Sequence, residues 1–454
     1  MIGCAPAMVA LALAAAPLPP FTLEGAVSFA LEHHPAVRAQ IALEHGAEAD
    51  VAGARAALLP RLDASLELER STGNVVAGSA FALPGMPLTS GPAGTRDFDS
   101  GTFGSAISLS AGLDVVALLR RMDLVDASLA DRGRAKATTD VRRLAIAAGA
   151  AQAFLELAGA QEALKAARAA VARATSFATQ TDTLVAQELR PGADASRARA
   201  EIAAAGTLLA RAQQAVAVRR AQLGQALGLG GESLTIDAGA LARLPVQSSD
   251  ARQTHPLLVE ARQVVVAAGS RQSAMRLEFL PRIELAGALW ARGTGYDRGG
   301  TTPAPLGGLV PNTPNWGTAL IIAWPVLELF SVRAKEVAAT ASLDLAHARE
   351  DEVAQIVASE IEVTRAQLEG AKEIAARTIA ATDAARTAEQ QASARFAAGL
   401  GTALEVADAQ RLLAQAELDD ASGRLGVWTA MFLLSRALGD LEPFLAQTRS
   451  PQGS

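Results

Sequence analysis

The side chains that could do chemistry are few, and their spacing suits no catalytic or metal site. No histidine, cysteine or carboxylate lies at the spacing of a closed metal site near the His33-His34 pair, His255 or His347. His34 and His255 each precede a proline, which favours a structural role at the start of a helix. The sequence also lacks a phosphate-binding loop, a Ser/His/Asp arrangement and a metalloprotease motif. It therefore predicts neither an enzyme nor a cofactor.

Glu405 and Asp408 form an acidic pair with a suggestive spacing, because residues three apart share one face of a helix. They follow the turn 399–402, whose glycines permit a sharp reversal and whose threonine can cap the next helix together with Glu405. No proline interrupts residues 326–398 before the turn or residues 402–438 after it. The first helix would be roughly 100 Å long, which suits a rod, a duct or a coiled coil.

Composition narrows the class of protein. Half of the residues are hydrophobic but only 4% are aromatic, and the net charge is −6. This alanine-rich composition favours closely packed helical bundles, and an acidic chain gives no footprint for nucleic acid. Residues 1–16 are apolar and uncharged, which predicts a signal peptide. The single cysteine, Cys4, lies either in that leader or at a lipidation site.

Four segments of about ten residues alternate between apolar and polar side chains, which predicts strands. They begin near Arg61, Phe103, Ile283 and Trp316, and we expect the fourth to reach Val326. Trp290, Trp316, Trp324 and Tyr296 lie in or beside these strands, either as an interfacial aromatic belt or as core residues.

A membrane crossing by this chain would have to use these strands. The longest uncharged run after the leader, residues 299–327, contains five prolines and cannot form a spanning helix. Four strands alone would leave two open edges in lipid, so closure needs further copies of the chain. Three copies would supply twelve strands.

The chain also repeats itself. His34-Pro35 recurs as His255-Pro256, and Pro60-Arg61 recurs as Pro281-Arg282, both at an offset of 221 residues (255 − 34 and 281 − 60). An equal offset at two motifs indicates a duplication. We therefore expect a first repeat over 21–250, of helix, two strands, long helical hairpin and connector. A second repeat follows over 251–440, and we expect a loosely ordered tail over 441–454.

In this order the motifs resemble the TolC-like outer membrane efflux family. The resemblance rests on the opening 23–27 with His34-Pro35, on 58–62, on the repeats of these motifs, and on the turn 399–402 followed by 408–410. It covers nearly the whole mature chain. It implies a mainly α fold with a β membrane portion. In a homotrimer, twelve strands, four per chain, would form an outer membrane β-barrel joined to a long periplasmic α-helical barrel.

The resemblance implies a function as well. Such a channel is a passive exit duct for small toxic compounds, without catalysis or cofactor. It would sit in the cell outer membrane with its helical part in the periplasm. A periplasmic adaptor protein would connect it to an inner membrane pump of the RND or ABC type.

The resemblance further assigns residues to a periplasmic entrance formed by the tips of the helical hairpins. Glu405 and Asp408 match acidic positions of the constriction, where three copies would make a cation-attracting ring of six carboxylates. The alternative is a cap partner and a solvated surface acid. Asp194 and Arg199 match positions whose hydrogen bonds hold the entrance shut. Phe396 stands where some members carry a tyrosine, so its packing is expected to replace a polar latch.

The two turns are the parts expected to contact the adaptor. Their residues are Arg190, Pro191 and Gly192 in the first hairpin, and Gly399, Leu400, Gly401 and Thr402 in the second. Gly401 stands where some members of the family carry an arginine.

Two other functions fit the same residues. One is the outer membrane duct of a type I protein secretion system, which differs in cargo and pump. The other is an exported helical scaffold outside the membrane, whose strands form an ordinary sheet and which stays in the aqueous fraction.

Overall fold

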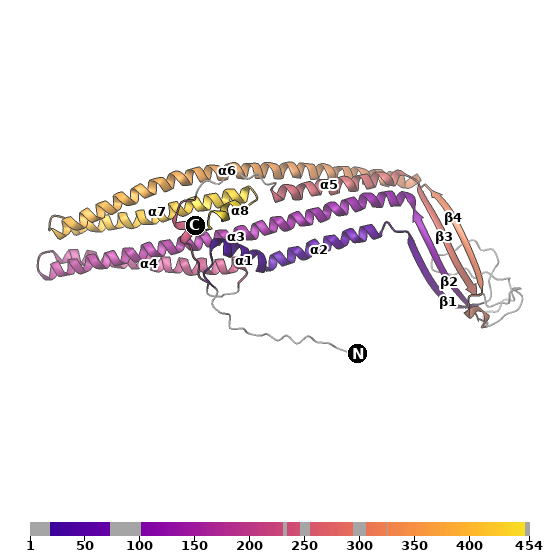
Figure 1. Cartoon of the computed structure of the whole chain (residues 1–454), viewed down its shortest axis with the longest axis horizontal. Helices are drawn as coiled ribbons and strands as arrows, with labels where there is room; N and C mark the ends of the chain where they lie inside the picture. Colours follow the sequence, from indigo (N-terminus) through magenta and orange to yellow (C-terminus); the bar gives the residue numbers. More distant parts are fainter. Residues whose placement is uncertain are drawn as a thin grey trace, which may run out of the picture. The chain divides into compact units, whose positions relative to one another are not determined.

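The computed structural model describes residues 19–72, 101–229, 234–245, 255–293, 306–324 and 326–449. Residues 1–16, with Cys4, and Tyr296 lie outside these ranges. The elements of the first half are α1 (Leu23–His33), α2 (Pro35–Ala56), β1 (Arg61–Thr72), β2 (Gly101–Asp114), α3 (Val115–Ala186), α4 (Gly192–Leu227) and the 3-10 helix η1 (Gly239–Ala242) (Figure 1). Those of the second half are α5 (Pro256–Arg276), η2 (Leu277–Phe279), β3 (Arg282–Gly293), η3 (Gly307–Leu309), β4 (Thr313–Ala323), η4 (Val326–Glu328), α6 (Leu329–Ala397), α7 (Ala403–Ala437) and α8 (Glu442–Ala446).

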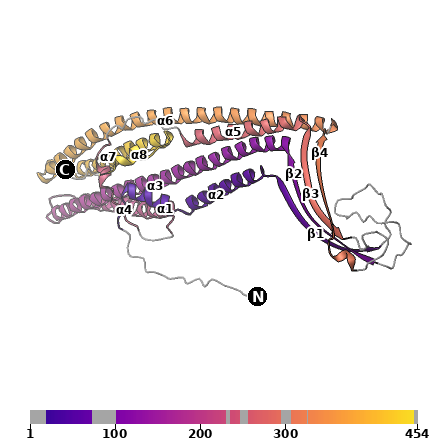
Figure 2. The ribbon, with the colours of Figure 1, turned by 45° about the vertical axis from the view of Figure 1, so that its right-hand side comes forward.

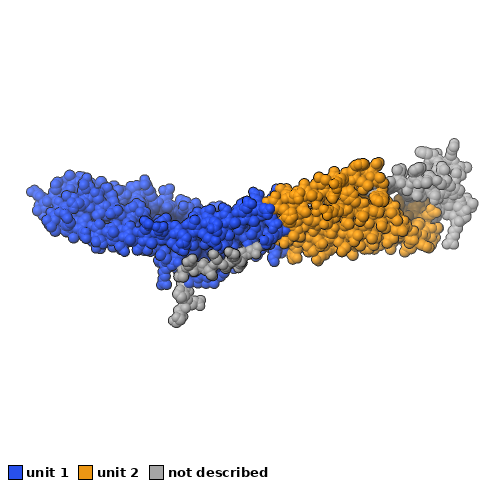
Figure 3. Space-filling view, turned by 90° about the horizontal axis from the view of Figure 1, so that it is seen from above, with its two compact units in different colours: residues 1–45, 134–262, 349–454 blue, residues 46–133, 263–348 orange. Residues whose placement is uncertain are grey.

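The chain forms two compact units (Figure 3). Unit 1 comprises residues 1–45, 134–262 and 349–454, and unit 2 comprises residues 46–133 and 263–348. Each unit draws on both halves of the sequence. The compact units are therefore distinct from the two sequence repeats.

The longest helices are α3, with 72 residues, and α6, with 69. At about 1.5 Å per residue each is roughly 100 Å long, as the absence of proline predicts. Helix α3 contains a window apolar and long enough to cross a bilayer, and half of that window is buried inside the protein. Burial of this extent is also found in the interior helices of proteins that do not span membranes.

Unit 2 contains one antiparallel sheet with the strand order β1-β2-β3-β4 (Figure 2). Successive residues of a strand lie on opposite faces, so the register decides which side chains share a face. One face carries the apolar set Leu62, Leu66, Ile107, Leu109, Leu285, Leu289, Trp316, Leu320 and Ile322. The other face carries Ser65 and Ser108, whose hydroxyl oxygens lie 2.8 Å apart. The predicted alternation is confirmed in all four strands.

One expectation about the strands was wrong. Strand β4 ends at Ala323 rather than Val326, because residues 326–328 turn into η4. Trp324 and Val326 continue the alternation of apolar residues beyond the point where β4 stops pairing with β3. The register also separates the tryptophans. Trp316 lies on the apolar face, whereas Trp290 pairs with Ser108 and lies on the opposite face.

Unit 1 is built on an apolar core to which α1, α3, α4, α7 and α8 contribute. Its members include Leu23, Val27, Phe154, Leu157, Leu223, Leu227, Trp428, Phe432 and Phe444. The indole nitrogen of Trp428 donates to the carbonyl oxygen of Arg243 at 2.8 Å, so this buried polar group is satisfied. At the start of α1, the N–H of Gly25 donates to Thr22 Oγ1, which confirms the predicted cap.

The predicted loose tail is corrected as far as Arg449. Phe444 is fully buried, with its ring 6.1 Å from that of Trp428 and 5.7 Å from that of Phe432. Arg449 pairs with Glu24 at 2.9 Å and with Glu442 at 2.6 Å. The tail contains prolines and looks irregular in sequence. It is nevertheless held against the core of unit 1, because burying apolar side chains such as Phe444 is favourable.

The two His-Pro motifs have the same structure, which supports the duplication. In each, the histidine Nδ1 accepts the N–H two residues on: from Ala36 to His34 at 3.1 Å and from Leu257 to His255 at 3.2 Å. Each histidine also packs against a glycine with positive φ just beyond a long helix, Gly228 for His34 and Gly439 for His255. The structural role expected of these histidines is confirmed.

Candidate functional site

The candidate site is the pair of hairpin turns in unit 1. In the first, Glu188 adopts φ 57° and the N–H of Leu189 donates to Leu184 O at 2.9 Å. In the second, Gly399 adopts φ 76° and the N–H of Leu400 donates to Arg395 O at 2.9 Å. Glu188 and Gly399 lie 211 residues apart (399 − 188), the same offset that separates Gly228 from Gly439 (439 − 228). The turns are therefore equivalent.

The two turns expose equivalent leucines. Leu189 is 65% exposed and Leu400 is 74% exposed. These two leucines therefore gain little burial within their own chain. Exposed apolar side chains of this kind are available for contact with another protein.

An apolar cluster joins the two hairpins beside the turns. Phe396 of α6 is 2% exposed, and its ring centroid lies 5.3 Å from that of Phe177 of α3. Ala198 of α4 and Val406 of α7 complete the contact. All four helices therefore meet in this cluster, and the hairpins cannot separate here without exposing two aromatic rings.

Arg190 adds a polar bond between the same hairpins. Its Nη2 donates to the carbonyl oxygen of Gly401 at 2.8 Å. Its guanidinium carbon lies 4.8 Å from the centroid of the Phe396 ring, within the range of a cation–π contact. Position 401 has little room for a side chain, because a Cβ there would lie 3.1 Å from the backbone nitrogen of Phe396.

Asp194 and Arg199 do not reach the second hairpin within the chain. The Arg199 guanidinium lies 3.5 Å from Asp182, across the first hairpin from α4 to α3, and both side chains are largely exposed. Asp194 lies in the first turn of α4, where its negative charge interacts favourably with the N-terminal end of the helix dipole. Its side chain has no partner among the described residues.

Glu405 and Asp408 both have partners inside the chain. The N–H of Glu405 donates to Thr402 Oγ1 at 3.3 Å, which confirms the predicted cap, and the Thr402 hydroxyl lies 3.3 Å from the Glu405 carboxylate. Asp408 pairs with Arg411 at 3.6 Å. Arg411 also binds Glu201 of α4. The hydrogen bonds with Glu201 raise the pKa of Arg411 further above its ordinary value, which already keeps the guanidinium charged.

Taken together, these four side chains keep an acidic character. Glu201, Glu405 and Asp408 supply three carboxylates against the one guanidinium of Arg411. Both Glu405 and Asp408 are exposed. The outer part of α7 next to the turn therefore presents negative charge to solvent.

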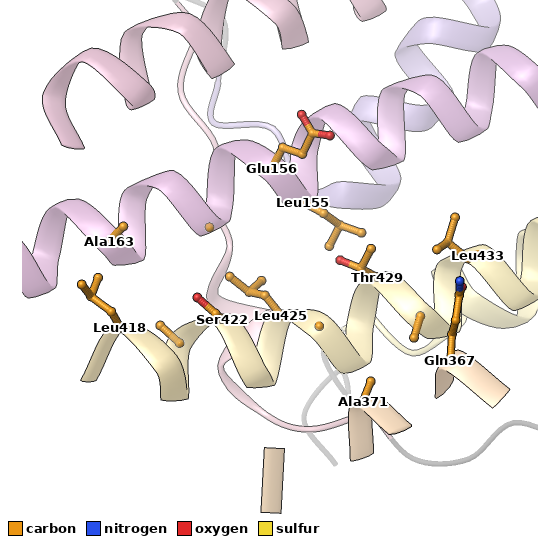
Figure 4. Close-up of a pocket in the computed structure, with 14 residues that line it drawn as sticks. Leu155, Glu156, Ala163, Gln367, Ala371, Leu418, Ser422, Leu425, Thr429 and Leu433 are labelled. Carbon is orange, nitrogen blue, oxygen red and sulfur yellow. The ribbon is translucent and has the colours of Figure 1, made fainter. Parts of the chain in front are cut away.

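A hollow of about 470 Å³ lies elsewhere in unit 1, among α3, α6 and α7 (Figure 4). Its walls are mainly alkyl groups, such as Leu155, Leu425 and Leu433. Glu156, on its rim, pairs with Arg219 at 2.7 Å. This lining suits packing rather than acid–base chemistry. No group of three or more metal-binding side chains gathers anywhere in the described ranges.

Comparison with known families decides the relationship. The sequence matches the outer membrane efflux protein family over residues 26–229 and 248–440, which is most of the chain. The chain belongs to the outer membrane efflux protein family. The TolC-like resemblance is thereby confirmed. No match was found among curated proteins.

Solved structures show the same fold in this family. The outer membrane channel OprN is 20% identical, with a TM-score of 0.73 over 92% of this chain and 89% of that one. VceC from Vibrio cholerae is 18% identical, with a TM-score of 0.75 over 92% and 96%. The open state of the MtrE outer membrane channel of Neisseria gonorrhoeae is 19% identical, with a TM-score of 0.71 over 92% and 89%. At these identities the likeness establishes the fold.

Sequence reasoning about this outer membrane efflux protein missed several contacts at the turns. It placed Arg190 among the turn residues without a partner, and it did not single out Phe177, Glu201 or Arg411. A signal existed in the offset of 211 residues, which aligns Arg190 with Gly401. The partners themselves depend on how two hairpins far apart in sequence pack together, and no local pattern specifies that.

Proposed function

We propose that this outer membrane efflux protein is the passive exit duct of a tripartite efflux system for small toxic compounds. One observation carries the membrane part of the proposal: the apolar face of the sheet is uncovered. Leu66 is 78% exposed and Leu320 is 62% exposed, and their neighbours on this face are similarly bare. In water this surface would cost about 25 cal/mol per Å² of apolar area, whereas lipid tails solvate it. A scaffold outside the membrane would need to cover it.

The open edges of the sheet support a trimer. Within the described chain, β1 pairs only with β2 and β4 pairs only with β3. Each outer edge therefore presents unpaired backbone groups, which the hydrocarbon core of a bilayer does not tolerate. Three copies joined from β1 to β4 of the next would close a barrel of twelve strands. Strands of 11 to 14 residues are long enough to cross a bilayer when tilted.

The hairpin turns are the proposed periplasmic entrance. Around a threefold axis, Glu405 and Asp408 would form an acidic ring that favours cations, with Arg411 and Glu201 holding its shape. We assign the latch between the hairpins to Arg190 and Phe396, which bond across them, rather than to Asp194 and Arg199. In this proposal Phe396 has the packing role that the family resemblance implies.

Exposed leucines make the turns suitable contacts for the periplasmic adaptor. Leu189 and Leu400 stand at the two turns, with Pro191, Gly192, Gly399 and Thr402 leaving little bulk around them. An adaptor bound there would connect the channel to an inner membrane pump of the RND or ABC type. Type I protein secretion would use the same duct with another pump.

Conductance of the purified protein in planar lipid bilayers tests the duct. The proposal predicts an ion-conducting pore with a cation preference, read from the reversal potential in a salt gradient. Replacing Asp408 by asparagine should reduce that preference, because it removes three charges from the ring. The matched control is Asp419→Asn, an exposed acid farther along α7. A protein that inserts without conducting would contradict the proposal.

A cell assay tests the cargo and the adaptor. Loss of the gene should increase sensitivity to small toxic compounds, and the wild-type gene should restore resistance. Leu400→Asp should fail to restore it while keeping the channel in the outer membrane. Restoration by that variant would argue against the adaptor contact at the turn.

A further inference from the structure

The polar face of the sheet carries one large aromatic side chain, Trp290. Trp290 of β3 pairs with Ser108 of β2 and with Asn315 of β4, and Ser108 bonds to Ser65 of β1. These four side chains therefore share the face opposite the leucines. Gly317 confirms the direction of the ring, because a Cβ on that residue would lie 3.4 Å from the Trp290 atoms Cζ3 and Cη2.

The ring of Trp290 lies over the backbone of β4 at Gly317. Its neighbours on this face, by register, are Ser108, Ala288, Asn315 and Gly317, and Arg292 follows two residues along β3. Trp290 is the one aromatic residue that the described strands place on this face. It is 37% exposed, so the side of the indole that does not rest on Gly317 is open.

We propose that Trp290 is a stacking site for planar aromatic compounds inside the barrel. The inference rests on the proposed function, because a lipid-facing apolar surface puts the opposite face of the sheet toward the aqueous interior. An indole face binds flat π-systems through dispersion and quadrupole interactions, and stacking of this kind does not require a particular pattern of hydrogen bonds. The site would therefore bind planar aromatic compounds as a class rather than one particular compound. Such broad binding suits an exit duct that passes many compounds.

Fluorescence quenching tests where the ring lies. Acrylamide quenches tryptophans from water, and brominated phosphatidylcholine quenches them from lipid. Trp290→Phe should remove much of the acrylamide-quenchable emission of the reconstituted protein and leave the bromolipid quenching. Trp316→Phe should do the reverse, because Trp316 lies on the apolar face and is 75% exposed. Trp324, which is 61% exposed, and the buried Trp428 stay in both variants as a constant background.

Block of the ionic current tests the binding. Ethidium, a planar aromatic cation, should block single channels, and Trp290→Ala should raise its half-blocking concentration about 3- to 10-fold. Tetraethylammonium carries the same charge without a ring, so its block should change less than twofold. Trp290→Leu keeps an apolar cover over Gly317 but has no ring, and it should match the alanine variant.

The outcomes separate this inference from the proposed function. Absence of bromolipid quenching at Trp316 would overturn the barrel itself. Normal quenching at Trp316 together with bromolipid quenching at Trp290 would overturn only the position of the ring. Unchanged ethidium block in Trp290→Ala, or retained block in Trp290→Leu, would show that Trp290 only fills space over Gly317 and would overturn the stacking site.

Discussion

Arg190 shows how one side chain joins two hairpins that are distant in the sequence. The sequence could predict the turn that contains it, because turn chemistry is local. It could not predict the bond to Gly401 or the contact with Phe396, which depend on the packing of α3 against α6 and α7. The same limit applies to Asp194, whose expected latch the chain does not form by itself. Local patterns place residues on elements, and tertiary packing decides their partners.

Replacing Arg190 by alanine should loosen the entrance. The Gly401 carbonyl would lose its charged donor and Phe396 would lose its cover, at a cost of about 1–2 kcal/mol for a partly exposed bond. We expect a higher open probability in bilayer recordings and a lower melting temperature. Arg190→Lys should be intermediate, because an ammonium lacks the planar fork that stacks on a ring.

The control for this change is Arg197→Ala. Arg197 is an exposed arginine of α4 with no side-chain partner in the described ranges. Like Arg190→Ala, the substitution Arg197→Ala removes one positive charge from the first hairpin. Equal effects of the two variants on conductance would mean that charge, rather than the bond to Gly401, is responsible.

His255 should make the stability of unit 1 depend on pH. Burial lowers its pKa below the ordinary 6.5, with Glu360 opposing the shift. Above pH 6.5 both the folded and the unfolded chain hold the ring neutral. As the pH falls through 6.5 the unfolded chain binds a proton first, so the free energy of unfolding decreases.

The variant His255→Asn isolates this effect. Asparagine can still accept the N–H of Leu257 but does not titrate, so the melting temperature should fall less between pH 7 and pH 5 than in the wild type. The melting temperature in detergent is the measurement. An identical pH profile in the two proteins would assign the acid sensitivity to other groups.

At the scale of elements, periodicity predicted the strands and the long helices well, since each strand has one apolar face and each helix lacks proline. Its errors lie at the ends. Strand β4 was extended too far because Trp324 and Val326 keep the even spacing after the ladder has ended. Helix α8 was not predicted, because its five residues gain stability only from the core they dock on. Element ends depend on hydrogen bonds and contacts that periodicity does not record.

A pair of glycines tests the junction between long helices and the His-Pro motifs. Gly439→Ala should destabilise the protein by more than Gly399→Ala, although both residues have positive φ. Each pays about 1–2 kcal/mol for the left-handed backbone. Only at Gly439 would the new Cβ also meet other atoms, at 2.9 Å from Pro256 Cδ and 3.0 Å from His255 Cδ2, while nothing lies within 4 Å at Gly399. Equal losses of melting temperature would contradict the close packing at this junction.

Adjacent residues of β1 test which face of the sheet meets lipid. Leu66→Lys puts a charge on the apolar face and should cost about 2–4 kcal/mol if the side chain lies in the bilayer, so the amount of protein recovered in the outer membrane should fall. Ser65→Lys makes a comparable change on the opposite face and should be tolerated. The two variants differ by one position in the strand. A larger loss for Ser65→Lys would reverse the assignment of the faces.

At the scale of the whole molecule, the duplication and the family relationship were visible in the sequence because two His-Pro motifs and two Leu-Pro-Arg motifs recur at one offset. The structure adds the matching contacts of Gly228 and Gly439. Over the described residues it also shows a sheet with two open edges and one bare apolar face, which a single chain leaves unsatisfied. These features become compatible with each other when further copies and a bilayer complete the molecule.

The number of chains in the membrane-extracted protein tests this account most directly. The envelope would be separated into inner and outer membranes, and the protein would be extracted from the outer membrane in mild detergent and weighed by native mass spectrometry. The account predicts an assembly of three chains found in the outer membrane fraction alone. A single chain that stays in the aqueous fraction without detergent would contradict it.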